Sequence, residues 1–378
     1  MIEITLLDIF YIPFILLFGI ATSYYDCKYR KIKNSWIAAA LIYSVVALII
    51  LINIYESQGG EVSTEYIKLF FQNLAISLAF GVMLWMCNLW SAGDAKLFLA
   101  YSALIPLTTY KWGAIGLFPS YILLINTFTP LLFFLLIKVL VSLKPKDIFE
   151  EFLHTLNPKS IASFSLFIFG FSFLNEILFK FFGNTQNSAI TNVLVLFIFL
   201  ILLKRLNVNY AIIGAILSIL RIIFSFNSIF RISFFINFLF QLVLFVLLRY
   251  FIINLGNKAF SKQIFIESLE PGMCLAEDVI FEKGKYTKEL MRPGISFFNS
   301  ILNTISKTKS IFSNSFCLTN ADIIKIKRLH SSGKLKEHAI YIYEKIYFAL
   351  FMFIGVLLTL IFRGDLLMSV RKIIESFI

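Results

Sequence analysis

The stretch Trp90-Ser91-Ala92-Gly93-Asp94-Ala95-Lys96 separates two long apolar segments, residues 68–90 and 96–110. It places the carboxylate of Asp94 at the beginning of a hydrophobic segment. A second carboxylate, that of Asp26, ends the first apolar segment of the chain. Ionisable groups at the edge of a bilayer core are costly to desolvate, so both aspartates are candidate functional groups of a membrane protein.

The composition predicts a polytopic membrane protein. Of the 378 residues, 59% are hydrophobic and 15% are charged, which is far more apolar than a soluble domain needs to build one core. Segments of about 20 apolar residues are long enough to cross a bilayer as helices. We expect about ten transmembrane helices, at residues 7–25, 36–54, 68–90, 96–110, 115–141, 161–182, 190–203, 208–224, 232–253 and 346–362.

Charges beside the apolar segments predict the orientation. Glu3 and Asp8 precede the first segment, where a secretory signal would carry basic residues, so we expect this segment to remain as a helix. Basic residues are concentrated in the loop that follows, at 28–33, and the positive-inside rule places this loop in the cytoplasm. The same count places Asp94 on the side of Asp26, as two cooperating groups require.

The distribution of charge divides the chain into four parts. Residues 1–141 form a membrane core that carries both aspartates, and residues 142–253 contribute additional transmembrane helices. Residues 254–345 have a higher charge density and Pro-Gly turn signals, which predict a small cytoplasmic domain of mixed strands and helices. Residues 346–378 form a C-terminal transmembrane helix and tail. The expected fold class is therefore an all-α polytopic membrane protein with a small cytoplasmic mixed α/β domain.

Metal, cofactor and nucleic-acid functions are not indicated. The four cysteines show no CxxC spacing and the three histidines are scattered in polar segments, so we expect no metal and no cofactor. The formal net charge of +12 is typical of cytoplasmic loops that lie against the anionic lipid bilayer, and we expect no nucleic-acid partner.

A second group of charges lies within the later apolar segments. Glu176 and Lys180 stand four residues apart in the segment 161–182, in the favourable order for a helical ion pair. We expect these two side chains to neutralise each other, and we favour a structural role over transport for this region.

The chemistry that a pair of aspartates supports is acid–base hydrolysis. Two carboxyl groups in a poorly solvated site cannot both ionise easily, so they share a proton. One then acts as a base toward water while the other polarises an amide carbonyl. Each aspartate also has a structural interpretation: Asp26 as an ion pair with Lys28 or Arg30, and Asp94 as a helix N-cap.

Two short motifs surround the aspartates. The loop after the first segment contains, at alternate positions, Asp26, Lys28, Arg30, Ile32 and Asn34. The second motif is Gly93-Asp94-x-Lys96, in which the glycine permits a turn and close packing.

These motifs resemble those of the type IV prepilin peptidases, membrane aspartic proteases of the GxGD class, and more closely their archaeal branch, which includes preflagellin peptidases. That family carries Gly-x-Gly-Asp-x-Lys and an earlier Asp followed by a basic residue and Val/Ile-Pro-Asn. Here Ser91 stands at the first glycine and Lys33 at the proline. The clear resemblance covers residues 8–140.

The resemblance implies a function and a site. It makes residues 1–141 a GxGD aspartic peptidase core, with Asp26 and Asp94 as the catalytic pair and with Gly93, Lys96 and Asn34 in support. The implied reaction removes a short basic leader from pilin-like or archaellin precursor proteins at the cytoplasmic face of the cell membrane. The paired CxxC element of the relatives that also methylate their product is absent, which implies peptidase activity alone.

Two other classes of function remain open. Presenilin-like and signal-peptide-peptidase-like proteases also use a Tyr-Asp pair and a Gly-x-Gly-Asp segment, but their first aspartate lies within a late apolar span. Tyr25-Asp26 instead follows the first span and leads into a basic loop. A non-enzymatic transporter would carry more polar groups at the depth of the membrane. A pilus-assembly scaffold would tolerate replacement of both aspartates.

Overall fold

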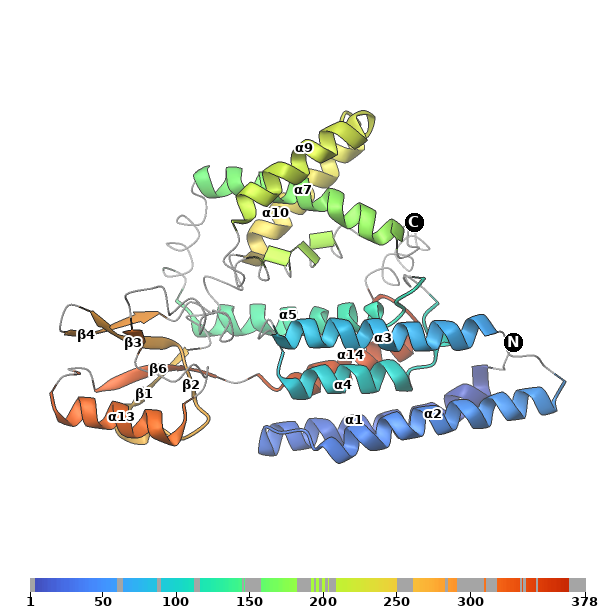
Figure 1. Cartoon of the computed structure of the whole chain (residues 1–378), viewed down its shortest axis with the longest axis horizontal. Coiled ribbons are helices and arrows are strands. Elements are labelled where there is room, and N and C mark those ends of the chain that lie inside the picture. Colours follow the sequence, from blue (N-terminus) through green and yellow to red (C-terminus); the bar gives the residue numbers. More distant parts are fainter. Residues whose placement is uncertain are drawn as a thin grey trace.

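The computed structural model is mostly helical, with a small region of strands. It describes residues 4–59, 64–86, 90–111, 116–144, 146, 158–181, 192–193, 195–196, 199–200, 203, 209–249, 261–282, 285–290, 309–310, 318–333, 335, 338–344 and 346–366. Two groups of helices and one mixed domain are distinguished in Figure 1.

The first bundle contains both aspartates. It consists of α1 (Ile4–Tyr29), α2 (Asn34–Ser57), α3 (Thr64–Met86), α4 (Ala92–Leu104), α5 (Tyr121–Ser142) and α14 (Phe348–Phe362), with the short 3-10 helix η1 (Leu107–Thr109) after α4. These helices lie nearly parallel or antiparallel to one another (Figure 1). Apolar side chains from all of these elements, α5 and η1 included, form one buried core, in which the rings of Phe18 and Tyr101 are 5.1 Å apart.

The second bundle consists of α7 (Pro158–Phe181), α9 (Tyr210–Ile229) and α10 (Ile232–Arg249). It lies on the opposite side of the first bundle from α1 and α2 and crosses α5 obliquely (Figure 1). Close approach of the backbones of α7 and α9 is allowed by Gly170, where an added Cβ would lie 2.4 Å from the carbonyl oxygen of Gly214.

Six of the described helices are long and apolar enough to cross a membrane, namely α1, α2, α3, α5, α7 and α9. This agrees with a multi-pass membrane protein. Four of the ten expected spans do not meet that criterion. The segments 232–253 and 346–362 form shorter apolar helices, 96–110 forms the 13-residue α4 followed by η1, and 190–203 lies largely outside the described residues.

The segment expected to be a mixed domain contains strands and one helix. Its elements are β1 (Ser261–Phe265), η3 (Ile266–Ser268), β2 (Cys274–Leu275), β3 (Glu277–Glu282), β4 (Lys285–Leu290), β5 (Lys309–Ser310), α13 (Asn320–Ser331) and β6 (Ala339–Tyr343). Two three-stranded antiparallel sheets have the orders β1-β6-β2 and β4-β3-β5. The domain lies at the end of the first bundle where α14 begins (Figure 1).

The last described helix, α14, fits closely between earlier ones. An added Cβ on Gly355 would lie 2.7 Å from the backbone of Thr127 in α5, and one on Gly19 of α1 would lie 2.1 Å from the ring of Phe353. Glycine at these two positions therefore allows α14 to pack against both α1 and α5.

A buried amide fixes the far end of α14. The Asn126 side chain of α5 donates hydrogen bonds to Thr359 Oγ1 at 3.0 Å and to the carbonyl oxygen of Gly364 at 2.9 Å. The backbone amide of Leu366 donates to Asn126 Oδ1 at 3.0 Å. One buried side chain thus forms hydrogen bonds with three polar groups at the end of the helix, where backbone groups have no intrahelical partners.

We expect Asn126→Leu to lower the free energy of unfolding by about 1–3 kcal/mol, because the backbone groups of Gly364 and Leu366 lose their partner. Reversible unfolding in mixed micelles measures this loss. The control is Asn53→Leu in α2, where the exposed amide donates only to its own helix; this variant should change the value by less than about 0.5 kcal/mol. Equal losses in the two variants would contradict a tethering role for Asn126.

Candidate active site

Asp26 lies in the last turn of α1, not in the loop as expected, because the helix continues to Tyr29. Its Oδ2 accepts a hydrogen bond of 3.1 Å from the backbone amide of Ala349, in the first turn of α14. The alternative interpretation, an ion pair with Lys28 or Arg30, does not match the described residues: Lys28 Nζ donates to the hydroxyl of Tyr24 at 2.9 Å. Asp26 therefore acts as an acceptor for the beginning of a helix that is 323 residues further along the chain.

Asp94 lies in the first turn of α4 and completes a capping box with Ser91. The backbone amide of Asp94 donates to Ser91 Oγ at 3.2 Å, and the backbone amide of Ser91 donates to Asp94 Oδ2 at 2.9 Å. Ser91 is thus the N-cap, and Asp94 is not the N-cap itself. The pattern Ser-x-x-Asp in the sequence was the signal for this role.

The capping box alone does not set Asp94 apart. Thr319 and Asp322 form the same arrangement at the beginning of α13 in the mixed domain. Asp94 differs from Asp322 because the charge of a second aspartate, Asp26, acts on it. Burial raises the pKa of the Asp94 carboxyl, hydrogen bonds from Ser91 lower it, and the negative charge of Asp26 raises it again. The charge of Asp26 therefore acts on the ionisation of Asp94.

Contacts between the two motifs hold this arrangement. Lys96 Nζ donates a hydrogen bond of 3.2 Å to Asn34 Oδ1, which joins α4 to the beginning of α2. Gly93 lies beside the loop between α1 and α2: an added Cβ there would be 3.7 Å from Ile32 Cδ1. The structure thus brings the predicted residues of the two motifs together at one end of the first bundle. Lys96 bridges the motifs and is not among the groups that shift the pKa of Asp94.

The two carboxyl groups can still accept and donate protons in this geometry. The described residues donate no hydrogen bond to Oδ1 of Asp26, so this oxygen is available to a water or a substrate. The carboxyl group of Asp94 is favoured in its protonated form by burial and by the charge of Asp26. A proton donor and a proton acceptor can therefore coexist here, as general acid–base catalysis requires.

The sequence did not reveal the part of α14 in this site. Ala349 contributes a backbone amide, which leaves no signature in the side-chain pattern, and it comes from a helix placed by packing against α1 and α5. Within the described part of the chain, no three His, Cys, Asp or Glu side chains gather into a ligand set for a metal ion.

Comparisons of the chain with protein-family models, with curated proteins and with solved structures gave no match.

We expect Ser91→Ala to lower the free energy of unfolding by about 0.5–2 kcal/mol, because the amide of Asp94 loses its acceptor. The matched control is Ser35→Ala, which removes an exposed hydroxyl from the first turn of α2. Unfolding of both variants in mixed micelles measures the difference. A loss no larger than that of Ser35→Ala would show that the capping box does not stabilise α4.

Proposed function

We propose that this protein is a membrane aspartic endopeptidase of the type IV prepilin peptidase kind, with Asp26 and Asp94 as the catalytic pair. The observation that carries the proposal is the meeting of the two motifs. Two aspartates from α1 and α4 lie at the same end of the bundle, close enough for the charge of one to raise the pKa of the other. The bond between Lys96 and Asn34 joins the supporting residues.

The proposed reaction uses the shared proton. The ionised carboxylate removes a proton from a water as its oxygen attacks the scissile carbonyl carbon, and the other carboxyl group donates its proton to the carbonyl oxygen. The C–N bond then breaks as the first carboxyl group passes the proton taken from water to the departing nitrogen, while the second carboxylate removes a hydroxyl proton from the intermediate, which restores the starting protonation of the pair. Burial of Asp94 favours the acid role for this residue in the resting state, and the open oxygen of Asp26 suits the base role.

We assign the site to the cytoplasmic face of the cell membrane. The basic loop between α1 and α2 supports this orientation by the positive-inside rule. The proposed topology has about ten spans, with the N-terminus outside and the mixed domain inside. The substrates are pilin-like or archaellin precursors, whose hydrophobic helix enters the bilayer and presents the leader junction at the interface, where both aspartates lie.

The orientation predicts the reactivity of Cys27, which is exposed and free beside Asp26. In a variant whose other three cysteines are replaced by serine, a membrane-impermeant maleimide should label Cys27 in inverted vesicles and not in intact cells. Gln58→Cys on the same cysteine-depleted background with Cys27→Ser serves as the control, because Gln58 ends α2 at the opposite side of the bundle. Labelling of Cys27 in intact cells would reverse the proposed topology.

The peptidase proposal predicts that Asp26→Asn and Asp94→Asn each slow leader removal by about 10²–10⁴-fold. Asparagine keeps an oxygen that accepts the amide of Ala349 or Ser91, so the fold should persist while the ionisable group is lost. Coexpression with pilin-like and archaellin precursors, followed by measurement of precursor length over time, gives the rates.

Glu56→Gln provides the matched control, because it removes an exposed acid at the far end of α2. It should leave leader removal unchanged. Thermal melting of all variants must agree with that of the wild type, which separates lost chemistry from lost fold. Full processing by either asparagine variant would leave both aspartates with capping roles alone and would exclude the peptidase mechanism.

A further inference from the structure

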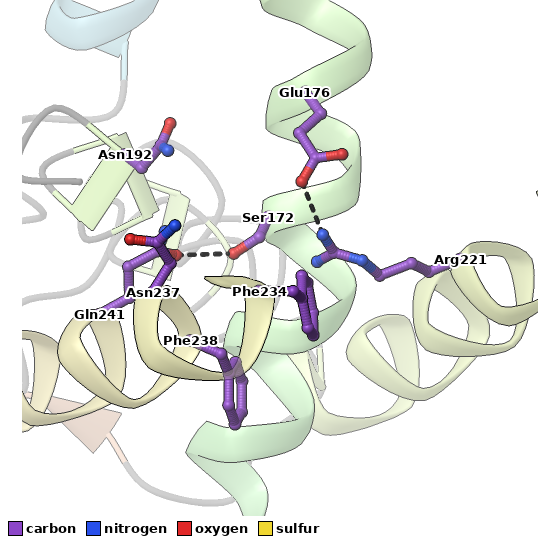
Figure 2. A pocket seen from close by; sticks show the side chains of 8 residues that line it. All are labelled: Ser172, Glu176, Asn192, Arg221, Phe234, Asn237, Phe238 and Gln241. Carbon is purple, nitrogen blue, oxygen red and sulfur yellow. Dashed lines mark hydrogen bonds and ion pairs between the residues drawn. The ribbon is translucent and has the colours of Figure 1, made fainter. Parts of the chain in front are cut away.

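The second bundle encloses a polar cavity of about 170 Å³ between α7, α9 and α10 (Figure 2). Its polar lining consists of Ser172, Glu176, Asn192, Arg221, Asn237 and Gln241. Both charged residues fall inside helical windows that are apolar enough to cross a membrane. Charges at such positions are costly and mark functional sites by default.

The prediction that Glu176 forms an ion pair with Lys180 is wrong. Glu176 Oε1 instead accepts a hydrogen bond of 2.6 Å from Arg221 Nη2 of the neighbouring helix α9 (Figure 2). The sequence could not supply this pairing, because the two residues are 45 positions apart and meet only through the packing of α7 on α9.

The guanidinium of Arg221 is held in place, but not all of its N–H groups donate hydrogen bonds to the described residues. Its side chain is 2% exposed, Nη1 donates to the carbonyl oxygen of Phe169 at 2.8 Å, and the group lies 4.5 Å from the ring centroid of Phe234. Among the described residues, the buried Nε has no hydrogen-bond partner. An unfilled donor on a buried cation is costly unless something occupies the space beside it.

The rest of the lining offers a negative charge and hydrogen-bond acceptors. The side chain of Glu176 is 45% exposed, so the carboxylate stands near the opening while the cation is enclosed. Asn192 Oδ1 is buried, and no described residue donates a hydrogen bond to it. Ser172 and Gln241 satisfy each other at 3.0 Å, and Asn237 is exposed on α10. A ligand that complements this lining would accept a hydrogen bond at Arg221 and donate one near Glu176 and Asn192.

We propose that this cavity binds a small zwitterion in which a carboxylate adjoins an ammonium group, as in an amino acid. The ligand carboxylate lies against the guanidinium of Arg221, and the ligand ammonium donates to Glu176, whose carboxylate stands near the opening. The adjacent opposite charges of the ligand match the adjacent opposite charges of Arg221 and Glu176. An apolar cavity of about 150 Å³ admits benzene, so the volume is sufficient for such a molecule.

Two sources supply this chemistry, a free amino acid and the serine headgroup of a phospholipid. The test uses the full-length protein in nanodiscs of phosphatidylcholine, which has no carboxylate. The probes are free glycine, the smallest molecule with both groups, and phosphatidylserine in the nanodisc. At saturation we expect at least one of them to raise the melting temperature by about 2 °C or more. Glycine alone identifies a free amino acid, and phosphatidylserine alone identifies a lipid.

Single-charge analogues and variants make the test specific. Acetate and methylamine should give no rise with the wild type. Glu176→Gln keeps an oxygen for Arg221 but removes the negative charge, so the zwitterion effect should disappear and acetate should now stabilise the protein. Asn237→Leu should block binding, because residue 237 of α10 lines the cavity, and it should leave the ion pair intact. Ser233→Leu on the same helix lies outside the lining and should not affect binding. Glu56→Gln is the matched control for charge.

Three results would overturn the proposal. The first is that neither glycine nor phosphatidylserine stabilises the wild-type protein. The second is that acetate or methylamine stabilises it as well as glycine does, which would indicate a simple ion. The third is a zwitterion effect that Glu176→Gln leaves unchanged, because binding would then lie elsewhere. None of these measurements uses leader removal, so they stand apart from the peptidase proposal.

Discussion

Hydrogen bonds from the first backbone amides of helices hold both aspartates in place. The first turn of a helix has amide groups without intrahelical partners, and a carboxylate is a favourable acceptor for them. Asp26 accepts from the beginning of α14, and Asp94 accepts from the N-cap of α4. In a region where water is scarce, these amides replace part of the solvation that each carboxylate loses. The site depends on two helices beginning at the same end of the bundle.

The helix that serves Asp26 also connects the bundle to the mixed domain. Only residues 344–347 separate β6 from α14, and Glu344 in this connection forms an ion pair with Lys138 of α5. Gly19 and Gly355 allow α14 to pack closely against α1 and α5. The position of the amide that contacts Asp26 is thus tied to the position of the domain that precedes it.

The two charged centres of the chain follow different electrostatic rules. Asp26 and Asp94 are like-charged groups, so their proximity favours a retained proton and acid–base chemistry. Arg221 and Glu176 are opposite charges that attract each other, which suits recognition of another dipolar group. The first centre lies at the end of its bundle, while the second lies within the apolar windows of α7 and α9. The proposed catalytic pair and the proposed binding site therefore lie in separate bundles.

The sequence by itself determined the helical membrane class, the positions of most helices and the two motifs, because apolar length and local spacing are properties of contiguous residues. It also indicated strands and a helix near the C-terminus. Only the tertiary structure decided that Lys96 reaches Asn34, that Ala349 serves Asp26 and that Glu176 pairs with Arg221 and not with Lys180. These contacts join distant segments through helix packing, and packing depends on the shapes of whole helix faces, which no local pattern encodes.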